Sequence, residues 1–142
     1  MKQQGFTLVE LLVVVAIIGV ISAVAMPLYK EHVDNARRSQ AKGALVAFAT
    51  RIERHYAETG SYEKDSDGNK ISADDIFYSE IPQGASGADR DYILSIEDSG
   101  TDDETYLIKA TANGAMAGDG DFSLSSTGVK AWGSTSCWEK SC

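Results

Sequence analysis

The chain of 142 residues has little of what an enzyme or a metalloprotein needs. Its two histidines, His32 and His55, lie 23 residues apart, and no serine, cysteine or carboxylate constellation accompanies either of them. It also lacks a glycine-rich loop of the kind that binds phosphate, and it lacks a cluster of metal ligands. We therefore expect no catalytic site, no cofactor and no metal centre.

The acidic loops come nearest to a metal site. Residues 65–69 place oxygen atoms at the spacing of a calcium loop, but the third acid and the distal bidentate glutamate of an EF-hand are missing. Residues 102–104 and 118–121 are also acidic. Such stretches are more often turns, so turns are the favoured interpretation, and calcium binding stays open.

Charged residues are absent from residues 11–29. As a helix this run is about 30 Å long, which is enough to span the hydrocarbon of a bilayer. The sequence thus predicts a polar leader at 1–5 and a transmembrane helix at 6–28. Glu10 lies inside the apolar entry. An acid at the centre of a membrane costs about 2.5 to 3.5 kcal/mol, and less near the interface, so its presence indicates a function.

Two simpler interpretations compete for this segment. A cleaved secretory signal would use residues 23–25 as its small-residue cleavage site, but Lys2 is the one basic residue before the apolar run. A plain membrane anchor would tolerate Glu10, but it gives no reason for the Gly5–Phe6 junction.

Residues 5–19, GFTLVELLVVVAIIG, resemble the leader and N-terminal segment of type IV prepilins. The resemblance implies that a prepilin peptidase cuts between Gly5 and Phe6 and methylates the new amino group of Phe6. It implies a single-pass inner-membrane protein with a periplasmic head, surrounded by lipid until an inner-membrane platform assembles it with other pilin subunits into an extracellular pilus. Glu10 would then neutralise a neighbour's Phe6 ammonium in the filament core, where an unpaired charge is strongly disfavoured.

Gly19 and Pro27 weaken a helix that is otherwise rich in valine and isoleucine. A proline inside a helix removes one backbone hydrogen bond and clashes with the preceding turn. By resemblance to pilins, the helix unwinds between these residues in the assembled fibre. A mere kink in one continuous helix is the equal alternative for the isolated subunit.

The rest of the chain, residues 29–142, predicts one globular head. Apolar residues at helical spacing continue the helix to about residue 58, and residues 59–91 form a loop. Short alternating runs at 92–96, 105–112, 121–126 and 129–132 predict three or four antiparallel strands, followed by a C-terminal loop that ends at residue 142. The expected fold class is α+β, with the helix from about residue 44 to residue 56 packed on the sheet.

The chain has two cysteines, Cys137 and Cys142, at its C-terminal end. A head exported across a membrane meets an oxidising compartment, so we expect a disulfide between them. In the chain-entropy model so small a ring contributes roughly 2 kcal/mol. A free thiol pair or a metal site is the alternative, but neighbouring ligands for a metal are missing.

Several stretches of the head resemble the pilin branch that holds PilE-type minor pilins and the DNA-uptake pilin ComP. These stretches are residues 44–56, 60–62, 92–94, 105–110, 124–128 and 137–138. Members of that branch often carry another cysteine before the strand that contains Leu124, where this chain has Gly-Asp-Gly-Asp at 118–121. Only the short C-terminal ring can therefore form.

The charge of the head argues against DNA. From Thr59 onward there are 16 acids and 6 bases. Because DNA affinity comes mainly from the neutralisation of phosphates by lysine and arginine, we do not expect nucleic acid as a partner. One local patch combines basic with aromatic residues and could contact DNA. The favoured interpretation is that its tryptophans pack on the sheet and its lysines are solvated. Its members are Lys130, Trp132, Trp138 and Lys140.

Together these observations predict a structural, non-enzymatic subunit of a type IV pilus. A minor pilin is the main interpretation, with adhesion, twitching motility or DNA uptake as the work of its filament. A type II secretion pseudopilin and a DNA-uptake receptor pilin are the alternatives. The sequence does not distinguish a major from a minor subunit, and it does not name the surface or ligand that the pilus contacts.

Processing of the N-terminus tests this interpretation. We expect the mature protein from a membrane fraction of its native host to begin at N-methylated Phe6, because the peptidase cuts after Gly5. The intact mass and N-terminal sequencing measure this directly. A mature chain that begins at Met26 would instead indicate an ordinary signal peptide, and the pilus interpretation would be lost.

Overall fold

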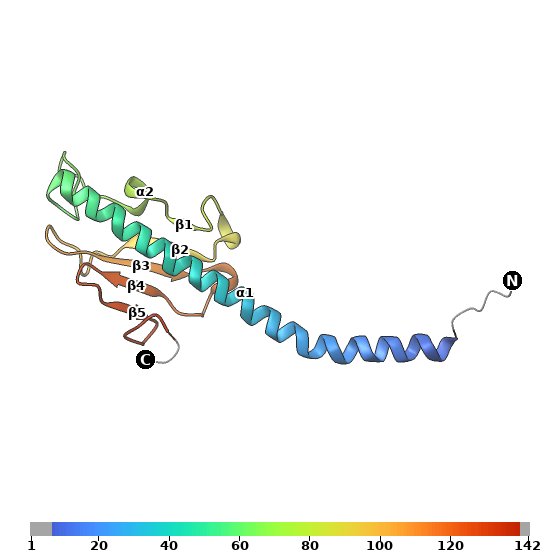
Figure 1. The fold of residues 1–142 in the computed structure, drawn as a ribbon. Coiled ribbons are helices and arrows are strands. Elements are labelled where there is room, and N and C mark those ends of the chain that lie inside the picture. The colour runs from blue at the N-terminus through green and yellow to red at the C-terminus, as the bar shows by residue number, and fades with distance from the viewer. Residues whose placement is uncertain (1–6, 140–142) are drawn as a thin grey trace. The chain divides into compact units, whose positions relative to one another are not determined.

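The computed structural model describes residues 7–139, and the chain divides into two compact units, residues 1–36 and 37–142. One helix, α1 (Leu8–Thr59), runs through both units (Figure 1). Pro27 lies inside this helix, which continues through Gly19 and Pro27 without interruption. Each unit is described separately below.

In the N-terminal unit, the helix carries apolar side chains on all sides. The large apolar residues between Leu8 and Tyr29 are each between 50% and 76% exposed. A helix that is hydrophobic all round needs an apolar environment outside itself. Among the described residues, α1 is the one helix long and apolar enough to cross a membrane, a test that considers length and composition alone.

The C-terminal unit contains one antiparallel sheet of five strands. The strands lie in the order of the chain, so each strand pairs with its sequence neighbour (Figure 1). The connections carry a short helix, α2 (Ala73–Ile76), and two 3-10 turns, η1 (Gly87–Asp89) and η2 (Gly114–Met116). The strands are β1 (Glu80–Ile81), β2 (Tyr92–Ile96), β3 (Leu107–Ala112), β4 (Phe122–Ser125) and β5 (Lys130–Trp132).

One face of the second half of α1 packs on this sheet. Phe48 is fully buried at the centre of the contact, and Ile108 and Phe122 are fully buried opposite it. Burial alternates along β3 and β4, as expected for a sheet with one face on a core. The helix contributes Ala41, Ala44, Leu45, Phe48 and Ile52. This arrangement confirms the predicted α+β fold of a long helix on a small antiparallel sheet.

The sheet differs from the prediction at its first strand, because it has five strands where three or four were expected. The extra strand, β1, lies in the segment predicted as a loop. It has two residues, too few for an alternating pattern to be read, and its position depends on the burial of Ile81, which is 1% exposed. The short helix α2 was missed for the same reason, although Ser72 and Asp75 form a capping box at its start.

Three tyrosines pack around the end of α1. The rings of Tyr56 and Tyr62 stack with centroids 4.3 Å apart, and Tyr106 meets the edge of Tyr62 at 5.0 Å. The Tyr62 hydroxyl donates a 2.8 Å hydrogen bond to Glu53. Burial, followed by this bond and the charge of Glu53, raises the pKa of Tyr62 to about 12. Burial, followed by the charge of Glu53, raises the pKa of Tyr106 to about 12.

These shifts predict a loss of stability in alkali. Both tyrosines have a higher pKa in the folded chain than the ordinary value of about 10. Their contribution to the free energy of unfolding is therefore complete below about pH 10 and falls as the pH rises towards about 12. We expect Tyr62→Phe to make this fall less steep, since one titrating group is removed. Urea unfolding followed by circular dichroism between pH 8 and 12 measures it.

Tyr29→Phe is the matched control, because Tyr29 is 73% exposed in the N-terminal unit. An equally steep loss of stability in Tyr62→Phe and in the unsubstituted chain would contradict the assignment.

Candidate nucleic-acid interface

The residues predicted to guide processing and assembly lie at the start of the chain. Gly5 and Phe6 lie outside the described residues, so cleavage and methylation there stay predictions. Glu10 lies in the first turn of α1, where its carboxylate accepts hydrogen bonds from the backbone N–H of Thr7 at 2.9 Å and from the Thr7 hydroxyl at 2.8 Å. The Glu10 N–H donates to the Thr7 hydroxyl at 3.3 Å. This capping box shows a local use of Glu10 that the sequence analysis missed, although the T-x-x-E spacing signals it.

The predicted patch of lysines and tryptophans lies at the edge strand β5. Lys130 pairs with Leu124 and Trp132 pairs with Phe122, so both side chains share the face of the sheet that packs on α1. Trp138, from the C-terminal segment, lies against the same face. Its indole N–H donates to the Ser123 carbonyl at 2.9 Å.

Both tryptophans pack on the sheet rather than stand open. Trp132 stacks on Phe122 with centroids 5.3 Å apart, and the guanidinium of Arg38 lies 5.2 Å from the centre of the Trp132 ring. Trp138 is 8% exposed and meets Phe122 edge-on at 6.4 Å. Trp138 therefore offers little ring surface to a nucleobase, and Trp132 is half-buried.

Two lysines lie over aromatic rings of this group, Lys130 over Trp138 and Lys42 over Phe122. The ammonium of Lys130 lies 4.9 Å from the centre of the Trp138 ring, within the range of a cation–π contact. Lys42, on α1, reaches the Phe122 ring at 5.6 Å and forms a 3.3 Å ion pair with Glu139. Within residues 7–139, Lys130 forms no ion pair with a carboxylate. Lys42, Lys130 and Trp138 are called the tryptophan corner below.

The predicted patch and the predicted disulfide each include one residue that lies beyond the described part of the chain. Cys137 takes part in a disulfide. Its expected partner, Cys142, lies outside residues 7–139, as does Lys140, so the pairing and the contribution of Lys140 stay predictions.

A buried ion pair holds the loop before β4 onto α1. Arg38 donates from Nε to Asp119 Oδ2 at 2.8 Å and from its terminal nitrogen to Oδ1, and the two side chains are 12% and 15% exposed. Tyr92 donates to the same carboxylate at 3.0 Å, and the Trp132 indole donates to the Asp119 carbonyl at 3.1 Å. Burial raises the pKa of Tyr92 well above its usual range, and the charge of Asp119 adds to this effect. Asp119 therefore connects α1, β2 and β5.

The sequence analysis missed this network because its members are far apart in the chain. Arg38 and Asp119 are separated by 81 residues. Asp119 was weighed as a turn residue or calcium ligand, in the place where related pilins often have a cysteine. The available signal was the position of Arg38 beside the apolar stripe of the helix.

In the acidic loops considered for calcium binding, the carboxylates accept hydrogen bonds or form ion pairs with other groups of the protein. Asp65 accepts from the N–H groups of Asp67 at 2.9 Å and Asn69 at 2.8 Å, and the hydrogen bonds from Asn69 are the main cause that lowers its pKa. Asp121 accepts from the Ala112 N–H at 3.0 Å and pairs with Lys109 at 3.1 Å. Within residues 7–139, no three histidine, cysteine, aspartate or glutamate side chains are grouped as metal ligands.

A second basic group lies on the opposite flank of α1. Arg51, Arg54 and His55 line a polar hollow together with Glu58 and Asp75. Arg54 pairs with Glu58 at 3.0 Å, whereas Arg51 forms no ion pair within the described part of the chain. This flank mixes both signs of charge and is the second candidate surface for an anion.

Comparison with known proteins identifies the family of the chain. Residues 27–123 match the family described as type IV minor pilin ComP, DNA uptake sequence receptor, and residues 1–26 match the prokaryotic N-terminal methylation motif. The chain belongs to the ComP family of type IV minor pilins. The matched segment contains α1 from Pro27 onward, the first three strands and the start of β4, but it ends before Lys130 and the C-terminal tryptophan.

Fimbrial proteins are among the relatives of this ComP-family pilin. It is 28% identical to fimbrial protein EcpC of Eikenella corrodens over 127 residues, which is 85% of this chain and 80% of EcpC. It is 42% identical to EcpB of the same organism over 59 residues, which is 42% of this chain and 37% of EcpB. It is 36% identical to the type IV major pilin PilE of Neisseria gonorrhoeae over 64 residues, 45% of this chain and 38% of PilE. No solved structure matches this ComP-family pilin.

The family corrects one prediction. Nucleic acid was not expected as a partner, because the head carries an excess of acids, but the matched family is described as a DNA uptake sequence receptor. The net charge of the whole head therefore does not by itself exclude such a partner. A duplex meets one face of a protein, so the potential over that face matters more than the sum over the head.

The buried ion pair of this ComP-family pilin makes a prediction about stability. We expect Asp119→Asn to lower the free energy of unfolding by about 1 to 3 kcal/mol, between the values for exposed and for fully buried pairs, because it removes the carboxylate charge that pairs with the part-buried Arg38. Thermal or urea unfolding of the full chain in detergent measures it.

Asp98→Asn is the control, because the carboxylate of Asp98 is 77% exposed in its 2.7 Å pair with Lys70. Exposed pairs contribute about 0 to 1 kcal/mol. Equal effects of the two substitutions would argue against Asp119 as the connection between α1 and the sheet.

Proposed function

We propose that this minor pilin binds duplex DNA at the surface of a type IV pilus during DNA uptake, and that the tryptophan corner contacts the phosphate backbone. The observation that carries the role is the family match across residues 27–123, most of which belong to the head. The position of the contact is our own inference from the charges and aromatic rings around β5.

The lysines of the tryptophan corner are available to a phosphate. Lys130 has no carboxylate partner within residues 7–139 and lies over an aromatic ring, a contact that it keeps when a phosphate approaches its outer side. Lys42 is paired with Glu139, whose side chain is 76% exposed. Because an exposed ion pair contributes about 0 to 1 kcal/mol, a DNA phosphate competes with Glu139 for Lys42.

The packing of the tryptophans favours a duplex over a single strand. Proteins that bind single strands offer open aromatic faces to the bases. Here Trp132 is half-buried against Phe122 and Arg38, and Trp138 is buried. The rings therefore position the cations, and contact with the sugar–phosphate backbone supplies the affinity. Base readout by hydrogen bonds would be a separate contribution.

The alternative as a secretion pseudopilin receives no support from the comparisons. The matched family and the three relatives described above are minor pilins, fimbrial proteins and a major pilin. Assembly into a pilus through the apolar helix, after processing by a prepilin peptidase, agrees with the N-terminal methylation motif.

DNA binding by the full mature chain in detergent tests the proposal. We expect a fluorescently labelled duplex to bind with an affinity that falls between about 50 and 200 mM salt, because phosphate contacts release counterions. Lys130→Gln should reduce the slope of log affinity against log salt by about 0.9, the loss of one phosphate contact, and Lys42→Gln should do the same. Fluorescence anisotropy measures both quantities.

Lys70→Gln is the matched control, because it removes the same charge from a lysine that is paired with Asp98 elsewhere on the head. The absence of any salt-dependent binding by the unsubstituted chain would overturn the DNA role itself. Binding that is insensitive to Lys130→Gln and Lys42→Gln but weakened by Arg51→Gln would keep the role and move the contact to the opposite flank of α1.

A further inference from the structure

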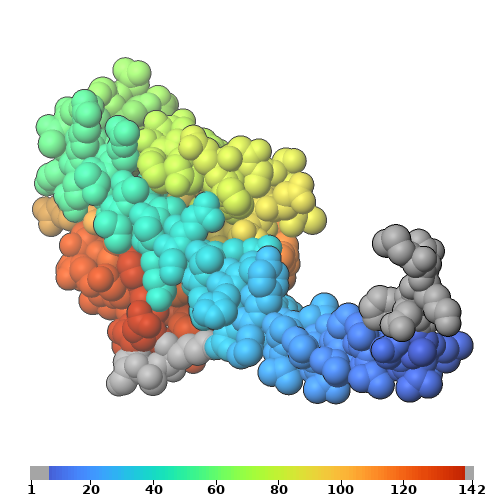
Figure 2. Space-filling model, turned by 45° about the vertical axis from the view of Figure 1, so that its right-hand side comes forward, coloured from blue at the N-terminus to red at the C-terminus, as the bar shows by residue number. Residues whose placement is uncertain are grey.

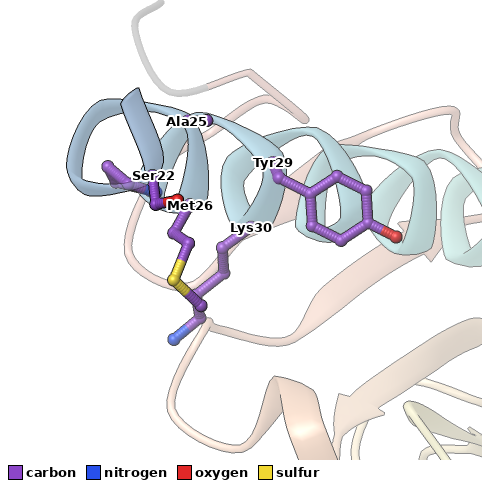
Figure 3. A pocket seen from close by; sticks show the side chains of 6 residues that line it. Ser22, Ala25, Met26, Tyr29 and Lys30 are labelled. Carbon is purple, nitrogen blue, oxygen red and sulfur yellow. The ribbon is translucent and has the colours of Figure 1, made fainter. Parts of the chain in front are cut away.

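The N-terminal unit contains a hollow beside Pro27, in a region that DNA binding does not involve. It is a shallow, mostly apolar hollow on the surface of the helix rather than an enclosed cavity. Figure 3 shows Met26 and Lys30 extending from the same face of the helix, with Ser22 one turn before them. The lining residues are Ser22, Ala25, Met26, Pro27, Tyr29 and Lys30.

The sequence explains why a hollow forms at this point. A proline within a helix loses its backbone hydrogen bond and bends the helix. Ala25 and Ser22, on the preceding turn, have small side chains that leave space beside it. Met26 is flexible and polarizable, so it adapts to an irregular apolar occupant.

The hollow lies where the apolar run ends. Lys30 is the first charged residue after Glu10, and Tyr29, next to it, is 73% exposed. Tyrosines are enriched where hydrocarbon gives way to headgroups, and lysines reach from there towards the water. In a bilayer, the floor of the hollow would face acyl chains, and its rim would lie near the lipid phosphates.

Lys30 has no competing carboxylate partner within residues 7–139. The nearby acids Glu31 and Asp34 have interactions of their own. An ammonium at the rim of an apolar hollow complements a lipid that carries a net negative charge. A zwitterionic lipid fits less well, because its own ammonium competes with Lys30 for the phosphate.

We propose that, before assembly, this hollow binds an anionic phospholipid. One acyl chain packs against Met26 and Pro27, and the headgroup phosphate pairs with Lys30. The lipid is chosen over a second copy of the chain because of this charge complementarity and because of the depth of the hollow in the bilayer. The site is independent of DNA binding, since it uses no residue of the head.

Native mass spectrometry of the full chain tests this proposal. The protein is released from detergent micelles that contain phosphatidylglycerol or phosphatidylcholine with the same acyl chains, and the fraction of chains that retain one lipid is compared. We expect phosphatidylglycerol to be retained about fivefold more strongly, the effect of one lysine at an anionic membrane surface. Lys30→Gln should remove this preference while some retention of both lipids remains.

Two further variants make the test specific. Lys70→Gln removes an equal charge from the head and should leave the preference unchanged. Pro27→Ala restores the backbone donor and straightens the helix, so it should reduce the retention of both lipids without harming the fold. Equal retention of the two lipids, or a preference that survives Lys30→Gln, would overturn the proposal. A lipid-free dimer that is lost in Pro27→Ala would assign the hollow to a second copy instead.

Discussion

The head depends on the packing of one face of α1 against the five-stranded sheet. Each strand pairs with its neighbour in sequence, so the sheet forms from local contacts, but a sheet with one uncovered apolar face is not stable in water. The second half of α1 supplies the cover. Phe48, Ile108 and Phe122 are each fully buried in this contact. Figure 2 shows this half of α1, cyan to green, lying directly against the C-terminal strands, orange to red. The Arg38–Asp119 pair and the bond from Trp138 to the Ser123 carbonyl then attach the loop before β4 and the C-terminal segment to the same layer.

The chain connects those edges to the helix by electrostatic means. Arg38 and Asp119 join the loop before β4 to α1. A buried ion pair is not inherently more stabilising than an apolar contact, since both charges must lose their water. The pair does, however, require one relative orientation, because the planar guanidinium can donate two hydrogen bonds to a carboxylate only when the two groups are aligned. The pair therefore fixes the position of Trp132 and, through Phe122, the position of the tryptophan corner.

The acidity of the head has a local explanation that the net charge conceals. Several carboxylates close their own turns, as Asp65 and Asp102 do by accepting backbone N–H groups. Others pair with lysines on neighbouring strands and loops, as Asp121 does with Lys109. Such carboxylates shape loops and neutralise bases where they lie. Lys130, at the edge strand, is left without such a partner within the described residues, so the potential near it differs from the potential of the head as a whole.

The helix and the strand that were predicted accurately from the sequence both have a regular hydrophobic periodicity. The helix was expected to end at about residue 58 and ends at Thr59, and the second strand was expected at 92–96 and spans Tyr92–Ile96. The elements that were missed, α2 and β1, have four and two residues and no period. The Arg38–Asp119 pair was missed because spacing within one element gives no information about two elements 81 residues apart. At the candidate interface, packed tryptophans were expected, but their contacts with Phe122 and Arg38 were not.

The N-terminal unit poses a different problem, because its apolar residues have no partners within the unit. Residues such as Leu11 and Ile18 are more than half exposed, so their favourable environment must come from outside. Lipid supplies it first, and neighbouring helices supply it in the filament. Since lipid tails are as apolar as valine and leucine, the exchange gains little from the hydrophobic effect alone. Packing and specific charge pairs must then drive assembly. The predicted pairing of Glu10 with a neighbouring subunit would supply such a charge at one end of the apolar run, and the lipid proposed at Lys30 would be displaced at the other.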